Sequence, residues 1–240
     1  MARKQFFLIV DTETTVDDTV ADFGAIVVDR KGEIHAQCAI LVKDHFDKME
    51  LFYNPNDTGF WGKQAAAARK ARYIEQMNAG SRMLAGVAAI NRWLEKAAGK
   101  FNPILTAYNL PFDVNKCGNT GIDLNMFSER FCLWAAAIGN ICTSKAYRKF
   151  ALENHLFNAP TQFRNMTYKT NAEAVAGFLV GEFREEPHTA IEDAIYFELP
   201  ILVALRFRQC WNNLKKKNWK EKIKPYNWKE FQVKDHYLPK

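Results

Sequence analysis

The chain of 240 residues contains no long hydrophobic run. No stretch approaches the roughly 18 consecutive apolar residues that a membrane-spanning helix requires. The basic start, residues 1–4, precedes only five apolar residues, which is too short for the apolar part of a signal peptide. We therefore expect a soluble, cytoplasmic protein with no membrane partner.

Paired cysteines are also lacking. The five cysteines make an odd number, and no two of them form a Cys-x-x-Cys pair. A zinc site built from Cys117, Cys132, Cys142 and His155 stays an alternative, but these spacings fit no usual zinc finger. We expect reduced, mostly buried thiols. The chain shows no internal repeat, and its length is typical of one large domain or of a domain with an appendage.

Positive charge is concentrated at one end of the chain. The net charge is +6, but residues 206–240 alone hold eleven Lys or Arg residues against three acidic ones. Tryptophans are scattered among the lysines of this tail. Lysine neutralises phosphates, and aromatic rings stack on unpaired bases. The tail therefore supplies candidate substrate-binding residues: Lys215, Lys216, Lys217 and Trp219. The alternative is a solvated amphipathic helix whose tryptophans pack on the core.

The hydrophobic pattern predicts strands first and then a mixture of helices and strands. Residues 22–30 and 33–43 alternate apolar and polar side chains around a turn, which is typical of a β-hairpin. Residues 44–61 look irregular. Helices are expected at 62–77, 81–98, 127–141, 145–155 and 171–181, with a strand at 104–108. This order favours an α/β fold.

Two of these helices have marked faces. In the helix at 81–98, an apolar stripe predicted to pack on the core contains Met83, Val87, Ile90 and Leu94. The helix at 62–77 is basic and offers a second candidate nucleic-acid contact at Lys63, Arg69 and Lys70. The alternative for these charges is an ordinary solvated face.

Two carboxylates follow the first buried strand. Residues 6–10 are apolar, and Asp11 and Glu13 come directly after them. Alternate strand residues point to the same face, so the two acids project together, roughly 6–7 Å apart at Cα. Two carboxylates this close repel each other unless a cation lies between them, and Mg²⁺ prefers oxygen ligands of this kind. The alternative is a strand that runs into a solvated turn.

A third acid follows the strand at 104–108. Pro111 suits the first position of a helix, because its missing N–H group has no partner there anyway. Asp113 therefore lies in the first helical turn, just past a strand end.

The last motif combines a histidine with a fourth acid. Thr189 and Glu192 fit a capping box with Thr189 as the N-cap, which gives Glu192 a structural role. Asp193 then lies in the first helical turn, and His188 lies just before the helix. Outside the helix, His188 is able to face the same cavity as Asp193.

These motifs, Asp-x-Glu, then Asn-x-x-Phe-Asp, then His-x4-Asp, resemble in their order the DEDD exonuclease superfamily. The histidine spacing is similar to that of its DEDDh, or DnaQ-like, branch. The resemblance covers about residues 5–205 and implies a ribonuclease-H-like fold of three layers, with a central mixed β-sheet flanked by helices. It divides the chain into an exonuclease domain at 1–205 and a basic C-terminal extension at 206–240. The segment at 44–80 and this extension depart from common family members.

The resemblance also implies an activity, namely 3′→5′ exonuclease hydrolysis of DNA or RNA with release of nucleoside 5′-monophosphates. Two divalent cations, Mg²⁺ or Mn²⁺, about 3.5–4 Å apart would stabilise the reacting oxygens. Their expected ligands are Asp11, Glu13, Asp113 and Asp193, with Asp11 bridging both cations. His188 is the expected general base, since an unperturbed imidazole titrates near pH 6.5 and is available at working pH. These five residues are the predicted catalytic set.

The implied partner is nucleic acid, most naturally a single-stranded 3′ end. Further candidate substrate contacts are Thr12, Thr14, Asn109 and Phe112. Two other hypotheses stay open: a catalytically inactive nucleic-acid-binding module of the same fold, and a phosphatase with an aspartyl nucleophile. The phosphatase is disfavoured because such enzymes use Asp-x-Asp, whereas the second acid here is Glu13. The sequence does not determine the preference for DNA or RNA, the biological pathway or the oligomeric state.

Overall fold

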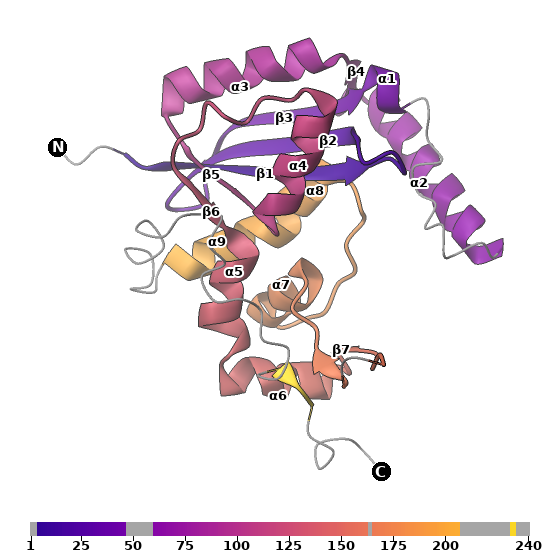
Figure 1. The fold of residues 1–240 in the computed structure, drawn as a ribbon, viewed down its shortest axis with the longest axis vertical. Helices are drawn as coiled ribbons and strands as arrows, with labels where there is room; N and C mark the ends of the chain where they lie inside the picture. Colours follow the sequence, from indigo (N-terminus) through magenta and orange to yellow (C-terminus); the bar gives the residue numbers. More distant parts are fainter. Residues whose placement is uncertain (1–3, 47–59, 163–164, 207–230, 234–240) are drawn as a thin grey trace.

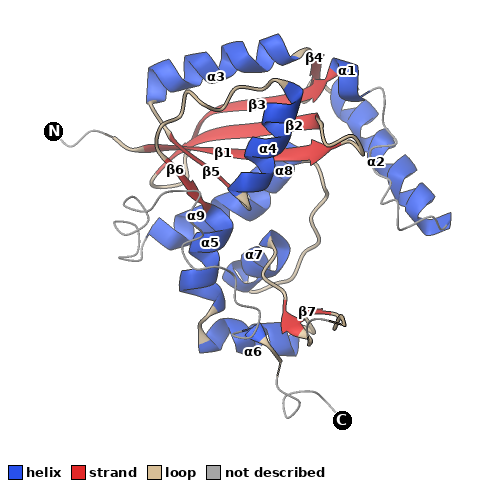
Figure 2. Ribbon diagram, in the orientation of Figure 1, coloured by secondary structure: helices blue, strands red, loops and turns tan. Residues whose placement is uncertain are grey.

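The computed structural model describes residues 4–46, 60–162, 165–206 and 231–233, and for residues 60–66 and 206 the backbone alone. Its central feature is a six-stranded sheet in the order β4-β3-β2-β1-β5-β6 (Figures 1 and 2). The strands of this sheet are β1 (Phe6–Thr14), β2 (Val20–Asp29), β3 (Ile34–Val42), β4 (Met83–Ala85), β5 (Ile104–Ala107) and β6 (Arg130–Cys132). A separate two-stranded sheet consists of β7 (Phe157–Asn158) and β8 (Thr167–Tyr168).

The central sheet is mixed. β1 pairs antiparallel with β2 on one side and parallel with β5 on the other. β2 and β3 form the predicted antiparallel hairpin, and Gly32 adopts a φ of 82° in its turn. The outer strands β4 and β6 run parallel to their neighbours.

Helices cover both faces of the sheet, because alternate residues of each strand enter different cores. Leu8 and Val10 of β1 belong to one core, and Phe7 and Ile9 belong to the other. The first core is closed by α3 (Val87–Phe101) and α4 (Leu110–Thr120). The second is closed by α5 (Leu133–Ala137), the π-helix η1 (Ile138–Cys142), α6 (Lys145–Glu153), α7 (Ala172–Val180), α8 (Ala190–Asp193), the π-helix η2 (Ala194–Glu198) and α9 (Leu199–Arg206). The predicted α/β architecture of three layers, typical of a ribonuclease-H-like fold, is confirmed.

The basic helix predicted at 62–77 is present as α2 (Phe60–Asn78), preceded by the short α1 (Lys43–Phe46). Tyr73 of α2 packs edge-on against Phe46, with ring centroids 5.6 Å apart. The two rings form one small buried cluster with Ala21 of β2 and Leu41 of β3. Figure 1 shows that β1 points towards α2, so this helix stands at the end of the sheet where Asp11 and Glu13 lie.

Two parts of the helical prediction are wrong. Residues 83–85 form β4 instead of the start of a helix, and Met83 is 63% exposed, whereas Ile90 and Leu94 of α3 are buried as predicted. Residues 130–132 form β6, and the helix predicted from residue 127 begins only at Leu133. Both strands have three residues, which is shorter than the four to eight residues over which strand alternation can be detected. Their pairing with β3 and β5 defines them.

Most of the basic tail, including Lys215, Lys216, Lys217 and Trp219, lies outside the described residues. The described piece at 231–233 packs against the domain. Phe231 and Val233 are buried in the same core as Ile9, and the Val233 N–H donates to the Met166 carbonyl over 2.9 Å.

Four cysteines are buried free thiols, in keeping with the expected reduced state, and they belong to both cores: Cys38, Cys117, Cys132 and Cys142. Within the described part of the chain, the side-chain groups able to hold a metal ion include no cysteine. None of the helices in that part is long and apolar enough to cross a membrane.

Candidate active site

Asp11 and Glu13 lie inside β1 and not beyond its end. β2 pairs with β1 as far as Thr14, and Gly24 of β2 lies opposite Asp11. The two acids share the face of the sheet that α8 and η2 cover. They therefore project together from a strand that stays paired with β2 along its whole length past both residues.

Asp113 reaches the same end of the sheet from the opposite face. Asn109 adopts a left-handed φ of 74°, and α4 then begins with Pro111 in its first turn, as predicted. Asp113 is 2% exposed, and the Thr12 hydroxyl donates a hydrogen bond to its Oδ1 over 2.8 Å. Since Thr12 points away from the face of Asp11, this bond holds Asp113 against the edge of β1.

His188 lies just before α8 and Asp193 lies in its first turn. The predicted capping box is wrong, because the Thr189 side chain makes no cap hydrogen bond. Instead, Asp193 Oδ2 accepts the Thr189 N–H over 3.0 Å, and Asp22 Oδ2 of β2 accepts the Ala190 N–H over 2.9 Å. Carboxylates thus accept the free N–H groups at the start of α8, and negative charge at this end of a helix is also stabilising.

The start of α8 lies directly on the sheet at Gly24. A Cβ atom at this position would lie 2.4 Å from the carbonyl carbon of Ala190 and 2.4 Å from the nitrogen of Ile191. Only glycine permits this approach. Because Gly24 pairs with Asp11, the approach brings the segment of His188 and Asp193 level with Asp11.

The predicted residues converge from three elements. Ligand atoms of Glu13, His188 and Asp193 lie within 4.8 Å of one another. Burial raises the pKa of Asp11 well above its ordinary value, and the charges of Glu198, Asp113, Glu13 and Asp193 raise it further. The structure therefore brings all four acids and the histidine to one end of β1.

The other three acids share this electrostatic environment. Burial, followed by the charge of Asp22, raises the pKa of Glu13 to about 8. Burial, followed by the charges of Glu186 and Glu13, raises the pKa of Asp193 to about 9. Burial raises the pKa of Asp113 to about 7 even though Thr12 donates to its carboxylate. A cation bound among these carboxylates would favour their ionised forms and so lower all three pKa values.

His188 differs from the acids in its left-handed backbone conformation and in its lowered pKa. It is exposed and adopts a left-handed φ of 53°, which histidine tolerates better than most residues and which is frequent at functional sites. Partial desolvation, followed by the positive charge of Arg69, lowers its pKa from 6.5. The imidazole is therefore neutral at pH 7 and able to accept a proton.

Sequence reasoning missed two further acids. Glu198 is buried, and its charge is the largest neighbouring charge acting on Asp11. Glu186 is half-buried, and burial followed by the charge of Glu173 raises its pKa to about 7. The signal for Glu198 was a single charged residue inside the apolar run at 194–205, because glutamate is almost never buried without a partner.

A buried ion network also escaped prediction. Arg82 places Nη2 2.6 Å from Glu192 Oε2 and 3.2 Å from Asp22 Oδ2. Asp22 accepts a hydrogen bond from the Tyr73 hydroxyl as well, over 2.9 Å. Since Asp22 also accepts the Ala190 N–H, Arg82 and Tyr73 fix the helix start beside His188.

Replacement of Arg82 by methionine is expected to lower the free energy of unfolding by about 3–5 kcal/mol, because it leaves the buried Asp22 carboxylate without its cation. Urea denaturation measures this difference. Replacement of the exposed Arg92 by methionine is the matched control, with an expected change within about 0.5 kcal/mol. A loss below about 1 kcal/mol for the Arg82 variant would contradict the network's structural role.

The predicted substrate contacts are spread around this end of the sheet. The Thr12 side chain is buried, Thr14 is half-buried, and Asn109 and Phe112 are exposed. In α2, Lys70 is exposed and Arg69 is half-buried, and the charge of Arg69 acts on both Glu13 and His188. The Lys63 side chain lies outside the described part of the structure.

Divalent cations fit this donor set. All the converging acids offer hard oxygen ligands, which Mg²⁺ and Mn²⁺ favour. Asp193 Oδ1 and Glu198 Oε2 are buried and have no hydrogen-bond partner among the described residues. A bound cation would satisfy such oxygens and offset the repulsion between the carboxylates.

Addition of Mn²⁺ at about 100 times its Kd is expected to stabilise the protein by about 2.7 kcal/mol, a rise in Tm of roughly 5–10 °C for a chain of this size. At a fixed Mn²⁺ concentration, this rise in Tm should become larger as the pH increases. Glu13 and Asp193 titrate in the folded protein at about 8 and 9, against ordinary values of 4.5 and 3.8. Without the cation, stability falls as pH rises between these values, because the folded state then binds more protons than the unfolded state.

Thermal unfolding at pH 6, 7.5 and 9 in Mn²⁺ and in EDTA measures this effect. Equal Tm values in Mn²⁺ and EDTA at all three pH values would contradict the assignment of a cation site.

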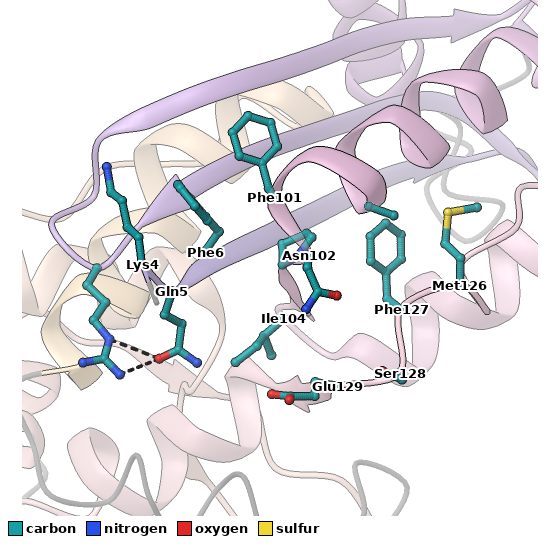
Figure 3. Close-up of a pocket in the computed structure, with 13 residues that line it drawn as sticks. Lys4, Gln5, Phe6, Phe101, Asn102, Ile104, Met126, Phe127, Ser128 and Glu129 are labelled. Atoms are coloured by element: carbon teal, nitrogen blue, oxygen red, sulfur yellow. Dashed lines mark hydrogen bonds between the residues drawn. The ribbon is translucent and has the colours of Figure 1, made fainter. Parts of the chain in front are cut away.

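A cleft lies at the other end of the sheet (Figure 3). Its volume is about 290 Å³, and among the described residues it is lined by Lys4, Phe6, Phe101, Phe127 and Glu129, besides others, but by none of the predicted site residues. Phe6 begins β1, so the cleft is separated from Asp11 by about 17 Å of strand. This cleft takes no part in the acidic site.

A second group able to hold a metal ion lies at the hairpin turn and consists of Asp29, Glu33 and His35. Lys4 Nζ lies 3.1 Å from Asp29 Oδ2, and His35 Nε2 lies 3.3 Å from the same oxygen. The Lys4 ammonium group therefore already balances negative charge in this group.

Comparisons with known proteins leave the family unassigned. No protein-family model and no curated protein matches the chain. Among solved structures, E. coli exonuclease I in complex with a 5cy-dT13 oligonucleotide matches with a TM-score of 0.47 and 16% sequence identity. The match covers 86% of this chain, and this chain spans 42% of that one. A likeness at this level does not assign a function to the chain.

Proposed function

We propose that this protein is a divalent-metal-dependent 3′→5′ exonuclease of the DEDDh type, which hydrolyses DNA or RNA and releases nucleoside 5′-monophosphates. The observation that carries the proposal is the convergence of Glu13, His188 and Asp193, with ligand atoms within 4.8 Å of one another, beside Asp11 and Asp113. In metal-assisted phosphodiester hydrolysis, acids of this kind hold the cations and a neutral base accepts the proton of the attacking water.

In this proposal the acids have different positions. Asp11, Glu13 and Asp193 share one side of β1 and would hold one cation, and Asp113, with Asp11, would hold a second. Bound cations supply positive charge that stabilises the attacking and leaving oxygens. The hydrogen bonds from Thr12 to Asp113 and from the Thr189 N–H to Asp193 orient two of these carboxylates. Such fixed orientation favours in-line attack.

His188 accepts the proton of the attacking water at its unprotonated ring nitrogen. Its lowered pKa supports this role, because the imidazole is then neutral over the whole physiological range. Its place outside α8 leaves the ring exposed to incoming substrate.

The nucleic acid meets positive charge on one side of the acids. Arg69 lies near Glu13 and His188, where a phosphate of the substrate can offset its charge. The exposed Phe112 ring, near the start of α4, offers a face on which a terminal base can stack. The basic tail at 206–240 supplies further phosphate contacts in this proposal.

A time course on 5′-labelled DNA and RNA oligonucleotides with Mg²⁺, Mn²⁺ or EDTA tests the function. We expect a ladder that shortens stepwise from the 3′ end with either cation and no hydrolysis in EDTA. Binding without hydrolysis under all conditions would favour an inactive binding module instead. Phosphate release from a monoester without nucleotide release would favour a phosphatase.

A further inference from the structure

Glu198 is a buried acid that the sequence motifs do not include. It is the last residue of η2 and is 2% exposed. Its Oε1 accepts the Tyr108 N–H over 2.9 Å. Its Oε2 is buried and has no hydrogen-bond partner in the described part of the chain.

The hydrogen bond to Tyr108 fixes the Glu198 carboxylate beside the acids of β1. β5 runs parallel to β1 with Ile9 opposite Thr106. Tyr108 directly follows β5, and extending this register by two residues would bring it level with Asp11. The electrostatics agree with this position. Among the neighbouring charges, that of Glu198 raises the pKa of Asp11 most. In turn, the charge of Asp113 raises the pKa of Glu198 most.

The π-helical turn explains how Glu198 reaches this position. In an α-helix, residues five apart point about 140° away from each other, which would separate Glu198 from Asp193. A π-helix takes more residues for each turn, so positions five apart lie closer to one face. η2 spans 194–198, directly after Asp193, and thereby turns Glu198 towards the acids. Such π-helical segments are frequent at functional sites.

A purely structural role would not need a carboxylate. One acceptor for the Tyr108 N–H is provided equally well by a neutral amide, and an unpaired buried carboxylate is costly. A glutamate here instead places a second oxygen, without a partner in the described part of the chain, where the charges of three other acids, Asp113, Glu186 and Asp193, act on it.

We propose that Glu198 is a fifth carboxylate of the cation-binding centre, with Oε1 anchored by Tyr108 and Oε2 available to a bound divalent cation or to a water on it. This inference rests on the proposed function, because it assigns a further ligand group to the same cations. It makes the centre one of five acids and a histidine.

Calorimetric titration of the full chain with Mn²⁺ at pH 8 tests the inference. Glu198→Gln keeps the shape and the acceptor for Tyr108 but removes the charge. We expect Mn²⁺ affinity to fall by roughly 10–100-fold, as for losses close to a metal. The Tm of the cation-free variant should exceed that of the parent, because one repelling charge is gone. Glu129→Gln, an exposed change at the far end of the sheet, should bind Mn²⁺ like the parent.

Unchanged Mn²⁺ affinity in Glu198→Gln would overturn the inference and leave Glu198 as an acceptor for Tyr108 alone. Glu198→Met, of similar length but without charge, provides the same test if the glutamine variant does not fold. Parent hydrolysis is measured in parallel. A parent that binds Mn²⁺ more tightly than Glu198→Gln but hydrolyses no oligonucleotide overturns only the proposed function, whereas a parent that binds no Mn²⁺ overturns both.

Discussion

Replacement of Asp11 by asparagine is expected to lower oligonucleotide hydrolysis by roughly 10³-fold or more. Asp11 is the acid on which the charges of Glu198, Asp113, Glu13 and Asp193 all act, so it lies at the centre of the site. Its loss removes a ligand shared by both proposed cations, whose charge contributes several kcal/mol to transition-state stabilisation. Initial rates on a 5′-labelled oligonucleotide with saturating Mn²⁺ measure the change.

The Asp11 variant should remain folded, because asparagine is isosteric and relieves repulsion at a half-buried position. Cation-free Asp11→Asn is therefore expected to unfold at a higher temperature than the parent. Asp123→Asn is the matched control, since Asp123 is exposed and asparagine retains an acceptor for the Asn125 N–H. Activity above a tenth of the parent in Asp11→Asn would contradict the assigned role of Asp11.

Replacement of His188 by asparagine is expected to lower kcat by roughly 10²–10⁴-fold, the usual contribution of a general base. Asparagine is the appropriate substitute because it also tolerates the left-handed backbone conformation, with φ at 53° in the parent. The Mn²⁺-induced rise in Tm should persist, since the carboxylates remain. Single-turnover rates and thermal unfolding in Mn²⁺ separate the two effects.

The pH dependence of the hydrolysis rate is a second test of His188 as the general base. The base acts when unprotonated, so the parent rate should fall as pH decreases through the lowered pKa, below 6.5. Arg69 depresses this pKa, whereas Glu173 and Glu185 raise it, and partial desolvation is the largest influence. At saturating Mn²⁺, the acid limb should be absent in His188→Asn. A loss of less than tenfold with an unchanged acid limb would assign the proton transfer to another group.

Local spacing was sufficient to predict the acids that lie on regular elements. Alternation in β1 places Asp11 and Glu13 on one face, and Pro111 after a strand places Asp113 in a first helical turn. The position of His188 just before α8 also followed from the sequence, although through a capping box that is wrong. The helix start is the same because Asp22 and Asp193 satisfy its N–H groups instead of Thr189.

The unpredicted parts depend on contacts between distant segments. Asp22 meets Arg82 and Ala190 only after β2, β4 and α8 have assembled, and no local pattern records these pairs. Glu198 reaches the acids through a π-helical turn, whereas the sequence favours a regular helix. Gly24 gave no signal either, because its requirement comes from the backbone of α8 lying on the sheet.

Diffraction from a crystal soaked in Mn²⁺, recorded near the manganese absorption edge, tests directly whether cations bind among the acids at the end of β1. We expect anomalous difference peaks between Asp11, Glu13, Asp193 and Asp113, with Glu198 facing them. Manganese at the hairpin group of Asp29, Glu33 and His35, with none beside Asp11, would contradict it.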